Sequence, residues 1–295
     1  MLQGIFTALA TPFTTEGQID FSALERLLLA QLAAGVHGIV LLGTTAETPT
    51  LSLDEKKQIL DFCMPRLQGK CQVIIGTGSN DTATTVANTE LAATYQPDAV
   101  LVVTPYYNKP NPAGLVAHYQ RVAQVGVPVI LYHIPGRTGL KVPQAVLTQL
   151  LQEVPQIVGI KESDYDSTHV MQTAVSYHKQ LAYLCGNDDL FPQYLAINAA
   201  GIISAAANVF APAFVQIYTL FKQGQAAQSF ELFSQLYPLI KACYAETNPT
   251  CIKYMLAQRG FGTAHVRLPL GAVSSDNQAR LDTLLKTANP QWMIS

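Results

Sequence analysis

The sequence predicts an α/β fold, a (β/α)8 barrel of the TIM type with a C-terminal helical extension. Three observations support this prediction. Short apolar runs alternate with helix-like segments eight times, the connections between them are short, and the alternation stops near residue 224. Such a pattern is typical of a closed parallel barrel. We therefore expect a catalytic barrel over residues 1–224 and a C-terminal helical domain over residues 225–295.

The predicted strands are apolar, as strands buried on both faces are. They cover residues 4–12, 38–42, 72–76, 99–103, 127–132, 156–161, 182–185 and 201–204. An open, doubly wound sheet is the structural alternative. The glycine fingerprint by which such a sheet binds a dinucleotide is absent, because Gly76-Thr77-Gly78 lacks the third glycine.

Helix signals separate these strands. Ser22 and Glu25 have the spacing of a capping box, and so do Ser52 and Glu55. Further helices are expected near residues 81–95 and 113–124 and from about residue 143. Past residue 224 no strand pattern remains, and we expect helices over residues 226–245, 249–258 and 277–288.

Composition excludes several classes of protein. The chain has 295 residues, of which 49% are hydrophobic and 13% charged, with a net charge of -2. That balance gives no electrostatic basis for binding nucleic acid or an acidic membrane. No apolar run is long enough to span a bilayer, and the N-terminus lacks the features of a signal peptide. Five scattered cysteines without a CxxC pair indicate a reducing cytoplasm rather than disulfides or a zinc site.

Lys161 is the first candidate catalytic residue. It ends the apolar run of residues 156–161, and catalytic groups of such barrels lie at the C-terminal ends of strands. Loss of hydration lowers the pKa of a lysine, and the neutral amine attacks carbonyls to form a Schiff base. The alternative is a lysine that only marks where the strand meets water.

Other reactive side chains follow neighbouring strands. Thr44 and Thr45 come after the second strand, Tyr107 after the fourth, and Tyr132 and Arg137 at and after the fifth. Two phenols linked by a threonine hydroxyl can carry protons beside a Schiff base. An arginine binds a carboxylate, and the backbone N–H groups around Thr44 can hold the carboxylate of a 2-oxo acid. Packing, turn hydroxyls and a solvated loop cation remain the alternatives. The six histidines show no spacing of metal ligands, so no metal is expected.

Four motifs carry a resemblance to a known family. They are GTTAE at residues 43–47, TPYYN at 104–108, YHIPGRTG at 132–139 and GIKE at 159–162. In order and spacing the chain resembles the dihydrodipicolinate synthase / N-acetylneuraminate lyase family over essentially its whole length. The second and third motifs are similar to the synthases rather than to the sialic acid lyases.

The resemblance implies a lyase that condenses pyruvate with L-aspartate 4-semialdehyde, in the diaminopimelate route to lysine. It implies a homotetramer built as a dimer of dimers, and no cofactor beyond the Schiff base of pyruvate. The site residues that it implies are Lys161 for the Schiff base, Tyr132 for proton transfer, Thr44 as the link to Tyr107 of a neighbouring subunit, Thr45 for pyruvate, Arg137 for the semialdehyde carboxylate, and the backbone of Gly186 and Ile203.

Several positions depart from the family pattern. Ala46 replaces a glycine, and His133 stands where asparagine is common. In the family's lysine-feedback pocket Asn80 and Tyr106 match, whereas the other positions hold Thr84 in place of the carboxylate and Leu53 and Lys56 in place of rings. A lysine effector loses its charge-assisted partner there, so we predict weak or absent inhibition by lysine.

Two competing functions remain open. One is a pyruvate-dependent aldolase for a sugar acid of the N-acetylneuraminate or 2-keto-3-deoxygluconate type. The other is a non-catalytic barrel that binds a small molecule or a partner, which the coexistence of Lys161, Tyr132, Thr44 and Tyr107 disfavours.

Overall fold

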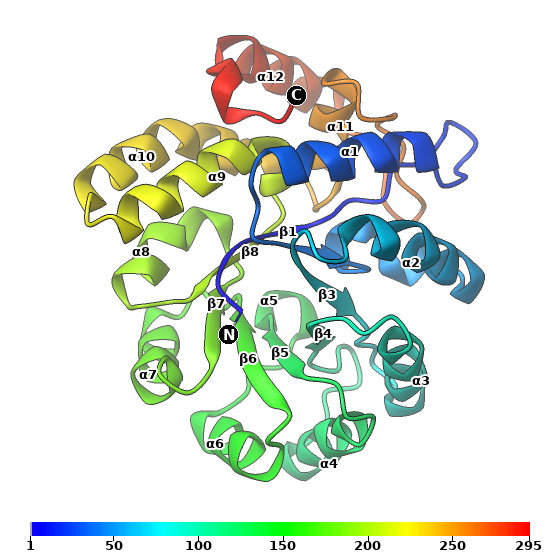
Figure 1. Ribbon diagram of the computed structural model, residues 1–295, viewed down its shortest axis with the longest axis vertical. Helices are drawn as coiled ribbons and strands as arrows, with labels where there is room; N and C mark the ends of the chain where they lie inside the picture. The colour runs from blue at the N-terminus through cyan, green and yellow to red at the C-terminus, as the bar shows by residue number, and fades with distance from the viewer. Residues whose placement is uncertain (1) are drawn as a thin grey trace. The chain divides into compact units, whose positions relative to one another are not determined.

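The structure is a computed structural model that describes residues 2–295. Eight parallel strands form one closed barrel in chain order, so the predicted barrel is confirmed and the open-sheet alternative is wrong (Figure 1). The strands are β1 (Gly4–Ala8), β2 (Gly38–Leu41), β3 (Gln72–Gly76), β4 (Ala99–Val103), β5 (Val129–His133), β6 (Ile157–Glu162), β7 (Ala182–Cys185) and β8 (Gly201–Ser204).

The described chain divides into two compact units. One comprises residues 2–3 and 72–203, and the other comprises residues 4–71 and 204–295. The first is called the β3–β7 unit here, and the second the β1–β2 unit. A separate helical domain beginning at residue 225 stays a prediction.

In the β3–β7 unit, helices follow each strand. They are α3 (Thr82–Ala93), α4 (Pro112–Ala123), α5 (Pro135–Thr138), α6 (Gln144–Glu153), α7 (Ser167–Tyr177) and α8 (Phe191–Ala196), with a 3-10 turn η3 (Asp188–Leu190). Neighbouring helices α3, α4, α6 and α7 pack in sequence along the outer side of the strands (Figure 1).

The pairing of β5 with β6 sets which side chains meet. Tyr132 lies opposite Lys161, and His133 lies opposite Glu162. Successive side chains of a strand point to opposite faces. Tyr132 and Lys161 therefore share one face of the sheet, and His133 and Glu162 share the other.

The β1–β2 unit is mainly helical. It contains α1 (Phe21–Ala33), η1 (Thr44–Ala46), η2 (Thr48–Thr50), α2 (Leu53–Leu67), α9 (Ala207–Lys222), α10 (Ala226–Cys243), α11 (Thr250–Gln258), α12 (Ser275–Thr287) and η4 (Pro290–Trp292). Helices α10 to α12 are the predicted C-terminal helices, and α10 lies beside α9 (Figure 1).

Two local predictions are corrected in this unit. The first strand ends at Ala8 rather than at Pro12, because the side chain of Asn208 accepts from the N–H of Ala10 at 2.9 Å. That N–H is thereby satisfied outside the sheet. Helix α1 is capped by Asp20, which accepts from Ala23, and not by Ser22. The capping box of Ser52 and Glu55 at the start of α2 is confirmed.

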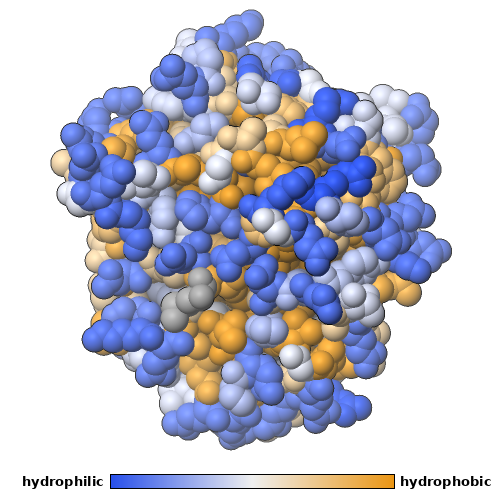
Figure 2. Space-filling view, viewed as in Figure 1, coloured by the Kyte–Doolittle hydropathy of each residue, from blue (hydrophilic) through white to orange (hydrophobic). Residues whose placement is uncertain are grey.

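The surface is mixed in polarity. Hydrophilic and hydrophobic residues intermingle over the face shown in Figure 2. Within residues 2–295, no helix combines the length and the hydropathy needed to cross a membrane.

Candidate active site

Lys161 lies beside Tyr132, as their paired strands dictate. The Lys161 amine is 4.1 Å from the centroid of the Tyr132 ring, and each residue is only 6% exposed. A cation at that distance from an aromatic ring is attracted by the ring's electron-rich face. The geometry therefore joins an amine that can attack a carbonyl to a phenol on the adjacent strand.

Gly186 lies beside Lys161. It follows β7, and its N–H donates to the carbonyl oxygen of Glu162 at 2.7 Å. A Cβ at Gly186 would collide with the hydroxyl of Ser163 and come within 3.1 Å of Cε of Lys161. Only glycine fits there. Ile203 is fully buried on β8.

Arg137 lies in the short helix α5 that follows β5, with its side chain exposed. The hydroxyl of Thr138 donates to Ile134 O at 3.1 Å and accepts from the N–H of Leu140 at 3.2 Å. Gly139 ends the helix in the left-handed conformation, at φ 65°. These contacts hold the arginine on a tight turn directly after Tyr132 and His133.

Tyr107 is exposed, whereas Lys161 of the same unit is buried. Its side chain is 89% exposed, on the loop after β4, and its φ is 72°. A left-handed backbone at a tyrosine stores strain of about 1–3 kcal/mol, which is commonly found at functional sites. The adjacent Asn108 donates to Asn80 O at 2.7 Å and ties the loop to the start of α3.

Thr44 and Thr45 form η1 in the β1–β2 unit. Thr45 is buried, and its hydroxyl accepts from Nδ2 of Asn248 at 3.0 Å. Thr44 is half-buried. Glu47 comes directly after η1 and has the left-handed conformation, at φ 56°. Ala46 fits at the position expected for glycine because the left-handed residue is Glu47 instead.

A buried ion pair anchors Glu47, the residue directly after η1. Lys253 of α11 contacts Oε1 of Glu47 at 2.7 Å, and the N–H of Arg267 donates to Oε2 at 2.8 Å. Burial lowers the pKa of Lys253 to about 8, although the charge of Glu47 opposes this shift. The roles of Glu47, Asn248 and Lys253 were not predicted from the sequence, since contacts over 203 and 206 residues leave no local pattern.

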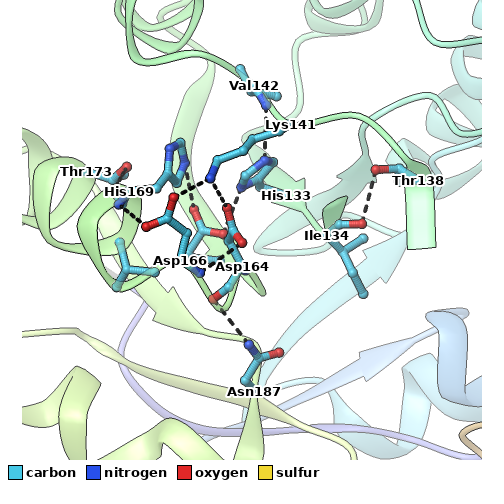
Figure 3. A network of polar contacts seen from close by, with 12 residues as sticks. His133, Ile134, Thr138, Lys141, Val142, Asp164, Asp166, His169, Thr173 and Asn187 are labelled. Carbon is cyan, nitrogen blue, oxygen red and sulfur yellow. Dashed lines mark hydrogen bonds and ion pairs between the residues drawn. The ribbon is translucent and has the colours of Figure 1, made fainter. Parts of the chain in front are cut away.

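A buried cluster that was not predicted from the sequence lies on the opposite face of the sheet from Lys161. One ring nitrogen of His133, one of His169 and one carboxylate oxygen of Glu162 lie within 4.8 Å of one another, and all three residues are buried. We call them the Glu162 cluster. His133 and His169 come together from β5 and α7, under the exposed chain of Lys141 (Figure 3). The sequence offered one signal for this position: Glu162 directly follows Lys161 in a strand, so its side chain points to the opposite face.

Hydrogen bonding decides whether this cluster suits a metal. Nε2 of His133 accepts from the N–H of Val142 at 3.1 Å. Nδ1 therefore carries the proton in the neutral ring and donates to Oε1 of Glu162 at 2.8 Å. Both nitrogens of His133 are occupied, and neither offers a lone pair to an ion. The cluster is a hydrogen-bonded network rather than a metal centre.

A family model described as the dihydrodipicolinate synthetase family matches residues 1–288. The chain belongs to the dihydrodipicolinate synthetase family.

Relatives within the dihydrodipicolinate synthetase family share this full length. The 4-hydroxy-tetrahydrodipicolinate synthase of Endomicrobium trichonymphae is 36% identical over 97% of this chain and 98% of that protein. The protein of the same name from Methanosarcina mazei is 38% identical over 97% of this chain and 98% of its own length. The solved 4-hydroxy-tetrahydrodipicolinate synthase of Methylacidiphilum fumariolicum SolV has a TM-score of 0.93 at 35% identity, covering 97% of this chain and 95% of that one.

Proposed function

We propose that this chain condenses pyruvate with L-aspartate 4-semialdehyde to 4-hydroxy-tetrahydrodipicolinate, through a Schiff base on Lys161. The observation that carries the proposal is the buried Lys161 amine, 4.1 Å from the Tyr132 ring centroid. Membership of the dihydrodipicolinate synthetase family supports it. The reaction is a lyase reaction of the aldolase type, in the diaminopimelate route to lysine.

The chemistry follows from the amine. Lys161 adds to the 2-oxo carbon of pyruvate and water leaves, so the nitrogen becomes an electron sink. The methyl group then loses a proton and its carbon attacks the aldehyde carbon of the semialdehyde. The amino group of the semialdehyde next attacks the imine carbon, which closes the ring and releases the Lys161 amine. Tyr132 carries the protons, and Thr44 links it to a second phenol, that of Tyr107.

Substrate binding uses the remaining predicted residues. Thr45 binds pyruvate, and the guanidinium of Arg137 binds the semialdehyde carboxylate in a bidentate manner. The backbones of Gly186 and Ile203 line the site. A Cβ at Gly186 would collide with the Ser163 hydroxyl and lie 3.1 Å from Cε of Lys161, which supports the place of Gly186 in this list.

The proposal includes a homotetramer, a dimer of dimers, in which Tyr107 reaches the site of a neighbouring subunit. Its 89% exposure and strained backbone in the single chain support this role. No metal or organic cofactor takes part beyond the Schiff base itself. Five free cysteines, four of them buried, fit a reducing cytoplasm as the place of action.

The first test is substrate dependence. Purified protein is mixed with pyruvate, with and without aspartate 4-semialdehyde, and pyruvate consumption is followed. We expect consumption only with the semialdehyde. Borohydride trapping of pyruvate on Lys161 without that consumption would favour the sugar-acid aldolase, tested by cleavage of N-acetylneuraminate or 2-keto-3-deoxygluconate. No trapped adduct at all would favour a non-catalytic barrel.

Two variants separate the roles of the site residues. Lys161→Ala should lose the borohydride adduct entirely, because no other residue supplies the amine. Tyr132→Phe should keep the adduct but turn over about 10²–10⁴-fold more slowly, the usual effect of removing a positioned acid–base group. Mass spectrometry measures the adduct and the consumption assay measures turnover. An unimpaired Tyr132→Phe would rule out Tyr132 as the proton carrier.

A further inference from the structure

We infer that the Glu162 cluster is a positioning device that holds Tyr132 against Lys161 from the opposite face of the sheet. Glu162 and His133 are then positioning residues rather than catalytic ones, with His169 as their third member. The inference deepens the proposed function and rests on it, since it assumes that Tyr132 and Lys161 react together.

The register of the barrel connects the two faces. Each member of the reacting pair has a cluster residue as its next neighbour in the chain: His133 follows Tyr132, and Glu162 follows Lys161. The strand pair is thus joined on one face by the amine and the ring, 4.1 Å apart, and on the other by a hydrogen bond of 2.8 Å. A shift between the strand ends has to break the second contact before it can change the first.

The cluster also fixes the chain on either side of this bond. The N–H of Val142 donates to His133, and the N–H of Asp164 donates to Oε1 of Glu162 at 2.8 Å. Nε2 of His169 on α7 lies 3.6 Å from Oε2 of Glu162. His133, Asp164 and His169 therefore converge on one carboxylate, and Val142 is linked to it through His133.

The carboxylate is ionised in this setting. Burial alone would raise the pKa of Glu162, but the interactions with His133 and His169 outweigh it and keep the pKa below its usual value. A buried charge is costly to leave unpaired, so the network favours one arrangement over looser ones. The fold closes the cluster off on the outside, where Lys141 contacts Asp164 at 3.2 Å and Asp166 at 2.6 Å.

Rigidity of this kind matters for the proposed reaction. A displacement of about 1 Å at a reacting group can lower a rate by about 10²-fold. The hydrogen bonds and ion pairs of the cluster described above involve neither Lys161 nor Tyr132, so the effect of the cluster passes through the backbone of β5 and β6. That predicts an effect on turnover that exceeds any effect on pyruvate binding.

The test compares three variants of the full chain. Glu162→Leu removes every bond to the carboxylate, whereas Glu162→Gln keeps its shape and can still accept from His133 and Asp164. His118→Gln is the matched control, because His118 is a buried histidine of the same unit that lies on α4 and is hydrogen-bonded to Thr82. Steady-state kinetics, the rate of borohydride trapping and the melting temperature are measured for each.

We expect Glu162→Leu to lower kcat by about 10–10²-fold while KM for pyruvate changes little, and to slow trapping on Lys161. Glu162→Gln should recover most of the lost kcat. His118→Gln should keep the wild-type kcat even where it lowers the melting temperature.

Two results would overturn the inference. One is a wild-type kcat in folded Glu162→Leu. The other is a loss that only follows the unfolded fraction, with Glu162→Gln no better than Glu162→Leu. If Glu162→Leu does not fold, His133→Leu, which removes both the hydrogen bond to Glu162 and the one from Val142, takes its place with the same expected losses. Failure of the proposed function is seen separately, because the wild-type protein then does not consume pyruvate with the semialdehyde. In that case the effect of the cluster is measured by the rates of borohydride trapping on Lys161.

Discussion

At the scale of single residues, Lys161 and Glu162 show how a strand serves two purposes at once. One side chain lies beside an aromatic ring, and the next is buried with two histidines on the opposite face. Both positions depend on the period of two along β6. A substitution at either residue therefore acts on the same pair of strand ends.

Thr84 stands where the lysine-feedback pocket of the family has a carboxylate. The hydroxyl of Thr84 donates to Oδ2 of Asp81 at 2.6 Å, so this carboxylate already serves as the cap of α3. Burial lowers the pKa of Lys56, which is half-buried. Neither feature offers an uncommitted carboxylate to the ammonium of a free lysine.

We predict that lysine inhibits weakly or not at all, because the charge-assisted partner is missing at Thr84. Initial rates over a lysine titration measure this, with alanine as the control amino acid. Thr84→Glu should strengthen inhibition by restoring a carboxylate. Half-maximal inhibition of the wild type below about 1 mM, an ordinary effector affinity, would contradict the prediction.

At the scale of elements, η1 depends on α11. Thr45 is held by Asn248 just before that helix, and Glu47 by Lys253 within it. The Lys253 ammonium also lies 3.9 Å from the ring centroid of Phe13. The segment that carries Thr44 is thus anchored by side chains from the C-terminal helices.

Lys253→Met should be strongly destabilising, by roughly 3–5 kcal/mol, because it leaves the carboxylate of Glu47 buried without its cation. Urea unfolding measures the loss. Lys222→Met is the control, since Lys222 is an exposed lysine near the end of α9. Equal stability of the two variants would show that the Glu47 pair contributes nothing.

At the scale of the whole molecule, stability should depend on pH through a buried histidine. Burial lowers the pKa of His118 to about 4, against a usual value near 6.5. The folded protein therefore keeps His118 neutral, while the unfolded chain takes up a proton below about pH 6.5. This contribution to stability is complete above that pH and is lost as the pH falls toward 4.

We expect the free energy of unfolding to fall between pH 7 and pH 4.5, with up to about 3 kcal/mol arising from His118. Urea titrations at a fixed protein concentration measure it. His118→Gln removes the titrating ring, so its stability should depend less on pH over that range. An unchanged pH dependence would mean that other groups account for it.

Much of this architecture could be predicted from the sequence because its signals are local. Apolar runs and caps identify the strands and most helices, and the ends of strands identify Lys161 and Tyr132. Contacts between distant segments left no such signal. Asn248 reaches Thr45 across 203 residues, and His169 approaches Glu162 from another element. Asp20 replaced Ser22 as a cap because a carboxylate two residues earlier already accepts the N–H of Ala23.

The anchoring of η1 also bears on how the protein is made. Thr45 and Glu47 are synthesised early, whereas Asn248 and Lys253 follow 203 and 206 residues later. At about 5–20 residues per second, the ribosome needs on the order of ten seconds or more to add that length. During this interval the carboxylate of Glu47 has no ammonium to pair with. A nascent chain therefore acquires its supported η1 only after α11 has emerged, and prematurely terminated products lack it.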